Sequence, residues 1–343
     1  MTNICIAVDA MGGDHGPSVV VPATLQVLSE NTDLRLILVG KQPLIEAELA
    51  ATEITRDNAR LLIKNASQVV DMDELPSYAL RGKKDSSMRI ALNLMQEGVA
   101  QACVSAGNTG ALMATARFVL KMLPGVERPA IMFPLPSMQR SVYVLDLGAN
   151  VECQAVHLFQ FAVMGSVSIE AIQNIPSPRV GLLNVGSEAI KGTEQVKKAS
   201  QLLAATQGIN YVGYVEGDDI YKGTVDLIVC DGFVGNVALK ASEGLAAMML
   251  YYAKQEFTKN WYAKLLSIFA KPVLKSLFER FNTNHYNGGS LLGLRGVVLK
   301  SHGNASINAF ATAIRVAIKE VEQNVPEKIR QSVLTKLEDC EFA

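Results

Sequence analysis

Short runs of apolar, mostly β-branched residues recur along the chain, and each run is followed by a polar, glycine-containing stretch and then by a helical periodicity. Five segments show the whole pattern: ICIAVDAMGGDHGP, ACVSAGNTGALMA, VYVLDLGANVE, VGLLNVGSEAIKG and LIVCDGFVGNVALKA. Uniformly apolar strands that alternate with helices are typical of parallel strands covered on both faces. The pattern therefore predicts an α/β fold with a mostly parallel sheet.

The polar stretches at the ends of these strands share one chemistry. Ligands of open α/β sheets bind beyond the carboxyl ends of the strands, so we expect the stretches to gather at one site. Glycine lets backbone N–H groups approach a ligand, and Asn, Ser and Thr add neutral donors, which together suit phosphate or a developing oxyanion. The candidate binding residues are Gly12, Gly13, Ser105, Asn108, Thr109, Gly235 and Asn236.

Few ionisable residues lie in these stretches. His15 and His302 are in glycine-rich segments and Lys191 follows the NVGSEA turn, so these three are the candidates for handling charge or protons. Asp9 and Asp231 each end a strand, where a carboxylate often caps the N–H groups of a loop. The familiar GxxxxGK[ST], GxGxxG and GxSxG motifs are missing at the expected places, so several loops together must build the site.

Composition narrows the class of protein. Lys and Arg number 32 against 33 Asp and Glu, and no basic block is interleaved with aromatics, so we expect no nucleic-acid partner. The five cysteines are scattered and never spaced CxxC, which favours a reducing, cytoplasmic compartment; we expect no metal and no cofactor. Cys103 and Cys230 lie inside apolar runs, and we expect both to be unreactive. The N-terminal apolar run is too short for a signal peptide.

Six segments resemble signatures of one known family. They are DAMGGDHGP, KKDSSM, SAGNTGALMA, LDLGAN, DGFVGNVALK and GGSLLGLRGVVLKSHGNA. These segments resemble the bacterial phosphate acyltransferase family (PlsX), and the resemblance covers almost the full length. It implies a three-layer α/β/α sandwich, related to isopropylmalate dehydrogenases and phosphotransacetylases, that works as a homodimer.

The resemblance also implies a reaction. A fatty acyl group would move from acyl carrier protein to inorganic phosphate, giving acyl phosphate for phospholipid synthesis. A membrane-bound glycerol-3-phosphate acyltransferase, which would use that product, is then an expected partner. One departure is the segment GSEA before Lys191, which is less acidic than the family pattern and leaves the role of Glu188 open.

Direct attack of phosphate on a thioester needs no strongly basic side chain. It needs orientation, donors for the oxyanion and stabilisation of the departing thiolate. We expect Lys191 to supply positive charge, His15 or His302 to stabilise or protonate the thiolate, and Asp9 and Asp231 to brace the loops. The expected donors to phosphate and oxyanion are Ser105, Asn108, Thr109 and Asn236.

Three alternatives stay open. A phosphotransacetylase-like enzyme would use acyl-CoA in place of the carrier protein. A metal- and nicotinamide-dependent dehydrogenase would need clustered carboxylates, whereas these loops hold mostly amides, hydroxyls and glycine. A non-catalytic scaffold would have no need of such loops.

Basic residues around the DSSM segment are candidates for docking the acidic carrier protein. Lys83, Lys84 and Arg89 flank a predicted helix start at Asp85 and the serines after it. The alternative is a solvated helix end.

The segment from Gly244 to Phe281 departs from the strand–loop–helix pattern. Its apolar residues recur at spacings near three and four, which predicts two helical segments, with Pro272 at a kink or helix start. We expect residues 1–343 to form a single α/β catalytic domain, with residues 244–285 as a helical arm within it.

Basic residues alternate with the apolar residues of this arm. The arm therefore either packs against its twin in a homodimer or rests on an anionic membrane surface, as a peripheral membrane contact. The candidate membrane residues are Trp261, Leu266, Phe269, Lys271 and Lys275.

Overall fold

The computed structural model describes residues 4–52, 59–281 and 287–341, and it places the described strands in one mixed sheet. The order across this 11-stranded sheet is β3-β2-β1-β4-β11-β10-β5-β6-β9-β7-β8. The strands are β1 (Ile4–Asp9), β2 (Leu34–Gly40), β3 (Leu61–Asn65), β4 (Ala102–Ser105), β5 (Ala130–Leu135), β6 (Val142–Leu145), β7 (Arg179–Leu183), β8 (Asn210–Val215), β9 (Leu227–Val229), β10 (Gly289–Leu292) and β11 (Val297–Lys300).

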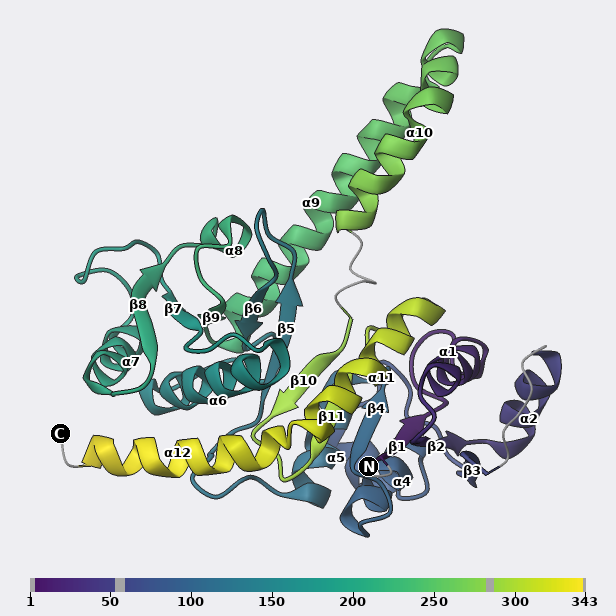
Figure 1. The fold of residues 1–343 in the computed structure, drawn as a ribbon, viewed down its shortest axis with the longest axis horizontal. Helices are drawn as coiled ribbons and strands as arrows, with labels where there is room; N and C mark the ends of the chain where they lie inside the picture. The colour runs from purple at the N-terminus through teal and green to yellow at the C-terminus, as the bar shows by residue number, and fades with distance from the viewer. Residues whose placement is uncertain (1–3, 53–58, 282–286, 342–343) are drawn as a thin grey trace.

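Helices cover both faces of the sheet (Figure 1). They are α1 (Pro17–Glu30), α2 (Gln42–Ala51), α3 (Pro76–Gly82), α4 (Ser87–Gln96), α5 (Thr109–Leu120), α6 (Ala155–Gln173), α7 (Glu194–Ala205), α8 (Asp219–Lys222), α9 (Gly232–Thr258), α10 (Trp261–Phe281), α11 (Ile307–Glu322) and α12 (Val325–Glu341). Alternate residues of the strands divide between the two faces: Cys103 packs with α4 and α5, whereas Val104 packs with α1 and α11. The predicted three-layer α/β/α architecture is confirmed.

Two antiparallel strands reverse the direction of the sheet at its centre. β10 runs antiparallel to both β11 and β5, and β5 runs antiparallel to β6. The strands β1 to β4 and β11 therefore end at one edge, which we call the first edge. The strands β6 to β9 are parallel to one another and end at the opposite edge, the second edge.

The helix α6 is long and apolar enough to cross a membrane, but 72% of its apolar window is buried inside the protein. Its buried residues include Phe159 and Phe161, which pack in one cluster with β5, β6, β7, β9 and α12. Among the described residues α6 is the one helix that meets this test, and its burial identifies it as a core helix.

The predicted arm is present as two long helices that project from the body (Figure 1). α9 has 27 residues and α10 has 21, so each spans roughly 30–40 Å. The break between them falls at residues 259–260, where Asn260 Oδ1 accepts a hydrogen bond from Ala263 N at 2.8 Å. Pro272 lies inside α10, so of the two predicted alternatives, a kink or a helix start, the helix start is wrong. Residues 282–285 of the expected arm lie outside the described residues.

Candidate functional site

Asp9 and Ser105 join the ends of two neighbouring strands at the first edge. The buried Asp9 carboxylate accepts a hydrogen bond from Ser105 Oγ at 2.6 Å, and Ser105 Oγ accepts one from Gly107 N at 3.1 Å. Burial raises the pKa of Asp9, and its hydrogen bonds act in the opposite direction. The proton of the Ser105 hydroxyl is thus used in the hydrogen bond to Asp9, and the two hydrogen bonds connect the end of β1 with the loop after β4.

Glycines let three loops meet at this edge. A Cβ on Gly12 would lie 2.6 Å from Gly107 N, and Gly13 has φ 85°, a conformation that favours glycine. Asp14 N donates to Gly303 O at 2.8 Å, so the loop after β11 closes over the loop after β1. The structure therefore brings the predicted residues of the β1 and β4 loops together and adds the loop that carries His302.

Lys300 is the functional candidate that the sequence analysis missed. It ends β11 beside Ser105 of β4, and its Nζ donates to Ala106 O at 3.1 Å and to Ser301 O. No carboxylate of the described residues forms an ion pair with it. Burial lowers the pKa of Lys300 to about 8, although the Asp9 and Asp14 charges partly counter the effect. An ammonium group beneath three glycine-containing loops is suited to an anionic ligand. The sequence feature that could have identified Lys300 is a lysine that ends an apolar strand directly before a glycine-containing loop.

The two predicted histidines share one asparagine. His15 Nε2 lies 2.7 Å from Asn304 Oδ1, and His302 Nδ1 accepts a hydrogen bond from Asn304 N at 3.2 Å. In neutral His302 the ring proton therefore lies on Nε2, which forms no hydrogen bond within the described part of the chain. Desolvation lowers the pKa of His302; Glu243 of α9 raises it, and Lys300 lowers it further. The third turn of α9 therefore lies near this site.

Asn108 and Thr109 begin α5 at the same edge. Asn108 Oδ1 caps the helix by accepting from Ala111 N at 2.9 Å, and its Nδ2 donates to Met72 O at 2.8 Å and to Glu74 O. The Asn108 side chain is therefore occupied, whereas the Thr109 hydroxyl forms no hydrogen bond among the described residues. The N–H groups of the first turn of α5 have no partner inside the helix.

The second edge holds a separate cluster. Asp146 accepts hydrogen bonds from Ile131 N at 2.9 Å and Asn150 N at 2.7 Å, and burial raises its pKa to about 6. Asp231 caps α9 by accepting from Val234 N at 2.8 Å. The residues Gly235 and Asn236 lie against this same loop, near Asp146 and Gly148.

Lys191 also lies toward the second edge. It follows β7, its side chain is 45% exposed, and its Nζ pairs with Glu188 at 2.8 Å. Lys300, Asp9, Ser105 and His302 at the first edge form what we call the Lys300 cluster. Within one chain this cluster therefore does not include Lys191, Asp231, Gly235 or Asn236. The expectation that all five loops gather at one edge is wrong, because β10 and β5 reverse the strand direction between the two groups.

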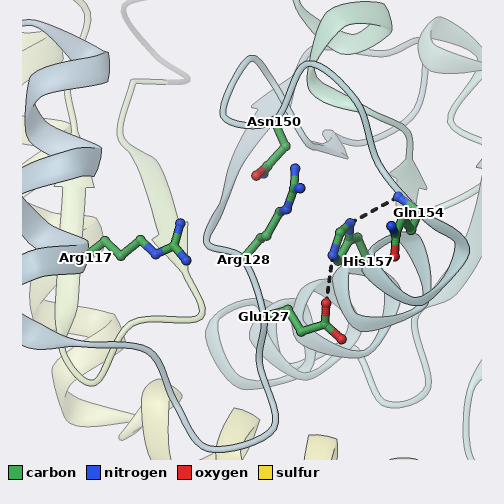
Figure 2. Close-up of a pocket in the computed structure, with 6 residues that line it drawn as sticks. All are labelled: Arg117, Glu127, Arg128, Asn150, Gln154 and His157. Carbon is green, nitrogen blue, oxygen red and sulfur yellow. Dashed lines mark hydrogen bonds and ion pairs between the residues drawn. The ribbon is translucent and has the colours of Figure 1, made fainter. Parts of the chain in front are cut away.

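A cavity of about 400 Å³ opens at the second edge (Figure 2). Arg117 reaches into it from α5, while Arg128 extends from the following loop toward Asn150. His157 Nε2 contacts Glu127 Oε2 at 2.9 Å on the opposite wall. Of the predicted loops, the LDLGAN loop contributes Asn150 to the lining of this cavity.

The predicted docking residues have different surroundings. Lys83 Nζ pairs with Glu74 at 2.6 Å and Asp71 at 3.2 Å, and its side chain is only 17% exposed. Lys84 is exposed, and the Arg89 guanidinium lies 5.0 Å from the centre of the Phe118 ring. Ser86 caps α4 as the predicted helix start requires, accepting from Arg89 N at 3.3 Å.

Residues 4–52, 59–281 and 287–341 contain no group of three His, Cys, Asp or Glu side chains placed to hold a metal. Burial raises the pKa of Cys103 and of Cys230, which keeps both thiols protonated.

Comparison with known proteins identifies the family. Residues 4–328 match the family described as "Fatty acid synthesis protein". A phosphate acyltransferase of Legionella pneumophila (strain Paris) is 57% identical over 333 residues, which cover 97% of each chain. The chain belongs to the phosphate acyltransferase family. A phosphate acyltransferase of Halorhodospira halophila is 55% identical over 97% of this chain and 96% of that protein.

Solved structures support the fold of this phosphate acyltransferase family member. A phosphotransacetylase from Streptococcus pyogenes superposes with a TM-score of 0.64 at 17% identity, covering 93% of this chain and 94% of that one. A 4-hydroxythreonine-4-phosphate dehydrogenase from Klebsiella pneumoniae gives 0.54 at 14% identity, covering 93% and 98%. The phosphotransacetylase-like fold is therefore confirmed.

Proposed function

We propose that this phosphate acyltransferase moves a fatty acyl group from acyl carrier protein to inorganic phosphate, giving acyl phosphate for phospholipid synthesis. The observation that carries the proposal is the Lys300 ammonium beneath the loops of Gly12, Ser105 and Gly303. It supplies a positive charge that no carboxylate of the described residues neutralises. The similarity to proteins named phosphate acyltransferase supports the same reaction.

The first step is attack by phosphate. A phosphate oxygen forms a bond to the thioester carbon while Lys300 and free N–H groups of the first turn of α5 hold the remaining oxygens. The Thr109 hydroxyl is a further donor at this position. Asp9 and Ser105 keep the loops in place and take no part in proton transfer.

The second step is departure of the thiolate. The tetrahedral oxyanion collapses, the C–S bond breaks, and the sulfur takes the electron pair. The Nε2–H of His302 stabilises the thiolate, and His15 holds Asn304, which fixes the His302 ring. Solvent supplies the proton that gives the free thiol.

The exposed helices of the arm support a location for the reaction at a membrane surface. In a single chain, Trp261 is 78% and Phe269 75% exposed, and Leu266 and Lys271 are also exposed. The Lys275 side chain lies outside the described part of α10. Such a surface supports a cytoplasmic homodimer whose arms pair along part of their length and rest on anionic lipid, near a membrane-bound glycerol-3-phosphate acyltransferase that takes the product.

Incubation of the full chain with acyl carrier protein thioester and labelled phosphate tests the reaction. We expect labelled acyl phosphate and free carrier thiol in equal amounts. A parallel reaction with acyl-CoA distinguishes the alternative donor. If neither donor gives acyl phosphate, the proposal fails; if acyl-CoA is strongly preferred, the carrier protein is not the donor.

A further inference from the structure

Helix α5 connects the Lys300 cluster with the cavity at the second edge. It begins at Asn108, beside the loops that hold Ser105 and Lys300, and Arg117 lies nine residues further on. At a rise of 1.5 Å per residue these two positions are about 13 Å apart along the helix. The positions between them include Met113, which is half-buried and packs against the core, and the half-buried Ala114.

The cavity has the charges of an anion site. Arg117 forms no hydrogen bond or ion pair with any described residue, and Arg128 uses one guanidinium nitrogen on Glu152 O at 3.0 Å. The one acidic wall residue, Glu127, turns toward His157 and away from Arg117 (Figure 2). Two guanidinium groups thus face the cavity with donors to spare, and guanidinium suits phosphate esters because of its planar fork of donors.

The surface beside the cavity is basic and aromatic. Phe118, the next residue of α5, is 52% exposed, with Arg89 5.0 Å and Lys121 4.8 Å from its ring centre. This surface complements an acidic partner, and it is continuous with Arg117 along α5.

We infer that the Arg117–Arg128 cavity binds the phosphodiester of the carrier protein's phosphopantetheine group, and that this group runs along α5 to present its thioester to the Lys300 cluster. The inference rests on the proposed carrier-dependent reaction and adds how the donor is recognised.

The length of the phosphopantetheine group agrees with this path. Pantetheine has the backbone length of about five extended residues, roughly 17 Å, which exceeds the rise from Arg117 to Asn108. Its apolar pantoyl part would cross Met113 and Ala114. The carrier protein itself would rest on the surface formed by Arg89, Phe118 and Lys121.

Two small donors that differ only in the phosphate test the site. The full-length protein is assayed with acyl-pantetheine and with acyl-4′-phosphopantetheine, at fixed inorganic phosphate. We expect the phosphorylated donor to have a KM about ten- to a hundredfold lower, as the loss of charged hydrogen bonds predicts. The substitutions Arg117→Gln and Arg128→Gln should raise the KM of the phosphorylated donor and not that of acyl-pantetheine. The KM values of the two donors should therefore converge, with kcat unchanged.

The matched control is Arg35→Gln, an exposed arginine at the start of β2, which should keep the donor ratio of the parent. Equal KM values for the two donors in the parent, or a ratio that survives in both cavity variants, overturn the inference while leaving the reaction intact. Absence of acyl phosphate from every donor overturns the proposed function and the inference with it.

Discussion

The Asp9 carboxylate and the Ser105 hydroxyl are 2.6 Å apart and link the ends of β1 and β4 in the interior of the protein. Ser105 also accepts the N–H of Gly107, so one hydroxyl fixes the loop after β4 in two directions. The pair explains how a stretch so rich in glycine keeps one conformation.

Removal of this hydroxyl should destabilise the fold. In Ser105→Ala the buried Asp9 loses a donor and Gly107 N loses an acceptor, so we expect the free energy of unfolding to fall by about 1–3 kcal/mol. Urea denaturation measures the change. Ser29→Ala, in which an exposed hydroxyl is removed from α1, serves as control and should shift stability by far less. An unchanged midpoint for Ser105→Ala would contradict the bracing role.

Lys300 should determine the response of phosphate binding to pH. Burial lowers its pKa to about 8, so the ammonium charge is present below that pH and is lost above it. We therefore expect the KM for phosphate to rise as pH increases from 7 to 9. Lys300→Arg, whose guanidinium stays protonated, should flatten that rise, and Lys300→Met should have a high KM throughout.

Steady-state kinetics with phosphate varied at several pH values gives this profile. Lys64→Met, which removes an exposed lysine at the far strand β3, is the control and should follow the parent. A Lys300→Met variant with the parent's KM and pH profile would show that this ammonium only ties the loops together.

The docking surface should depend on Arg89 and Lys84 more than on Lys83. Charge reversal at Lys84 and Arg89 should raise the KM for acyl carrier protein and weaken its dependence on salt, because fewer opposite charges meet. Lys83 is already paired with Glu74 and Asp71, so Lys83→Glu should lower stability. Initial rates at low and at high salt give the salt dependence of the KM for the carrier protein, which a loss of stability alone would not change. An unchanged salt dependence in the double variant would place docking elsewhere.

Much of the fold follows from the sequence, because local patterns specify the elements. The strands before Asp9, Ser105 and Asp231 and the caps at Ser86 and Asp231 each depend on a few neighbouring residues. The direction in which strands meet is not local. The short strands β10 and β5 reverse the sheet through pairings such as Leu292 with Ala130, which are 162 positions apart in the numbering and leave no periodic signal.

The same reason explains the errors about the site. Asn108 is of a residue type that often donates to ligands, but its amide donates to the carbonyl oxygens of Met72 and Glu74, which are distant in sequence. In the sequence Lys300 resembles any lysine at the end of a strand. Its pKa is lowered only because the loops fold over it and bury it. Arg117 and Arg128 acquire their common cavity from the path of the loop between α5 and β5.

Glu320 should make stability fall as pH rises through the acid range. Burial raises its pKa from 4.5 to about 7, with Ser290 Oγ as its hydrogen-bond donor. The folded chain then keeps a proton that the unfolded chain releases, so stability decreases between about pH 4.5 and pH 7, by up to about 3 kcal/mol from this group. Glu320→Gln should remove that part of the slope and be more stable than the parent at pH 8. Denaturation midpoints at several pH values, with the exposed Glu322→Gln as control, test this; parallel slopes would contradict it.

The arm should bind anionic lipid through the exposed face of α10. Trp261, Leu266 and Phe269 are exposed apolar residues of that helix, and Lys264 and Lys271 lie among them. Burial of the apolar side chains in the interface and attraction of the lysines act together, and each lysine contributes roughly 1 kcal/mol. We expect the protein to sediment with anionic vesicles but not with neutral ones, and to be released by high salt.

Two variants separate the apolar from the electrostatic part. Leu266→Glu combined with Phe269→Glu should abolish sedimentation while the protein still makes acyl phosphate and keeps the oligomeric state of the parent, measured by light scattering. Replacement of Lys264 and Lys271 by Gln should weaken binding about tenfold or more, because two contributions of roughly 1 kcal/mol are lost. Met138→Glu, at a site that is 84% exposed outside the arm, is the control for adding an acidic residue and should bind as the parent does. If the double glutamate variant sediments like the parent, lipid binding lies elsewhere; if it loses its oligomeric state, this face of α10 pairs with a second copy of the chain instead.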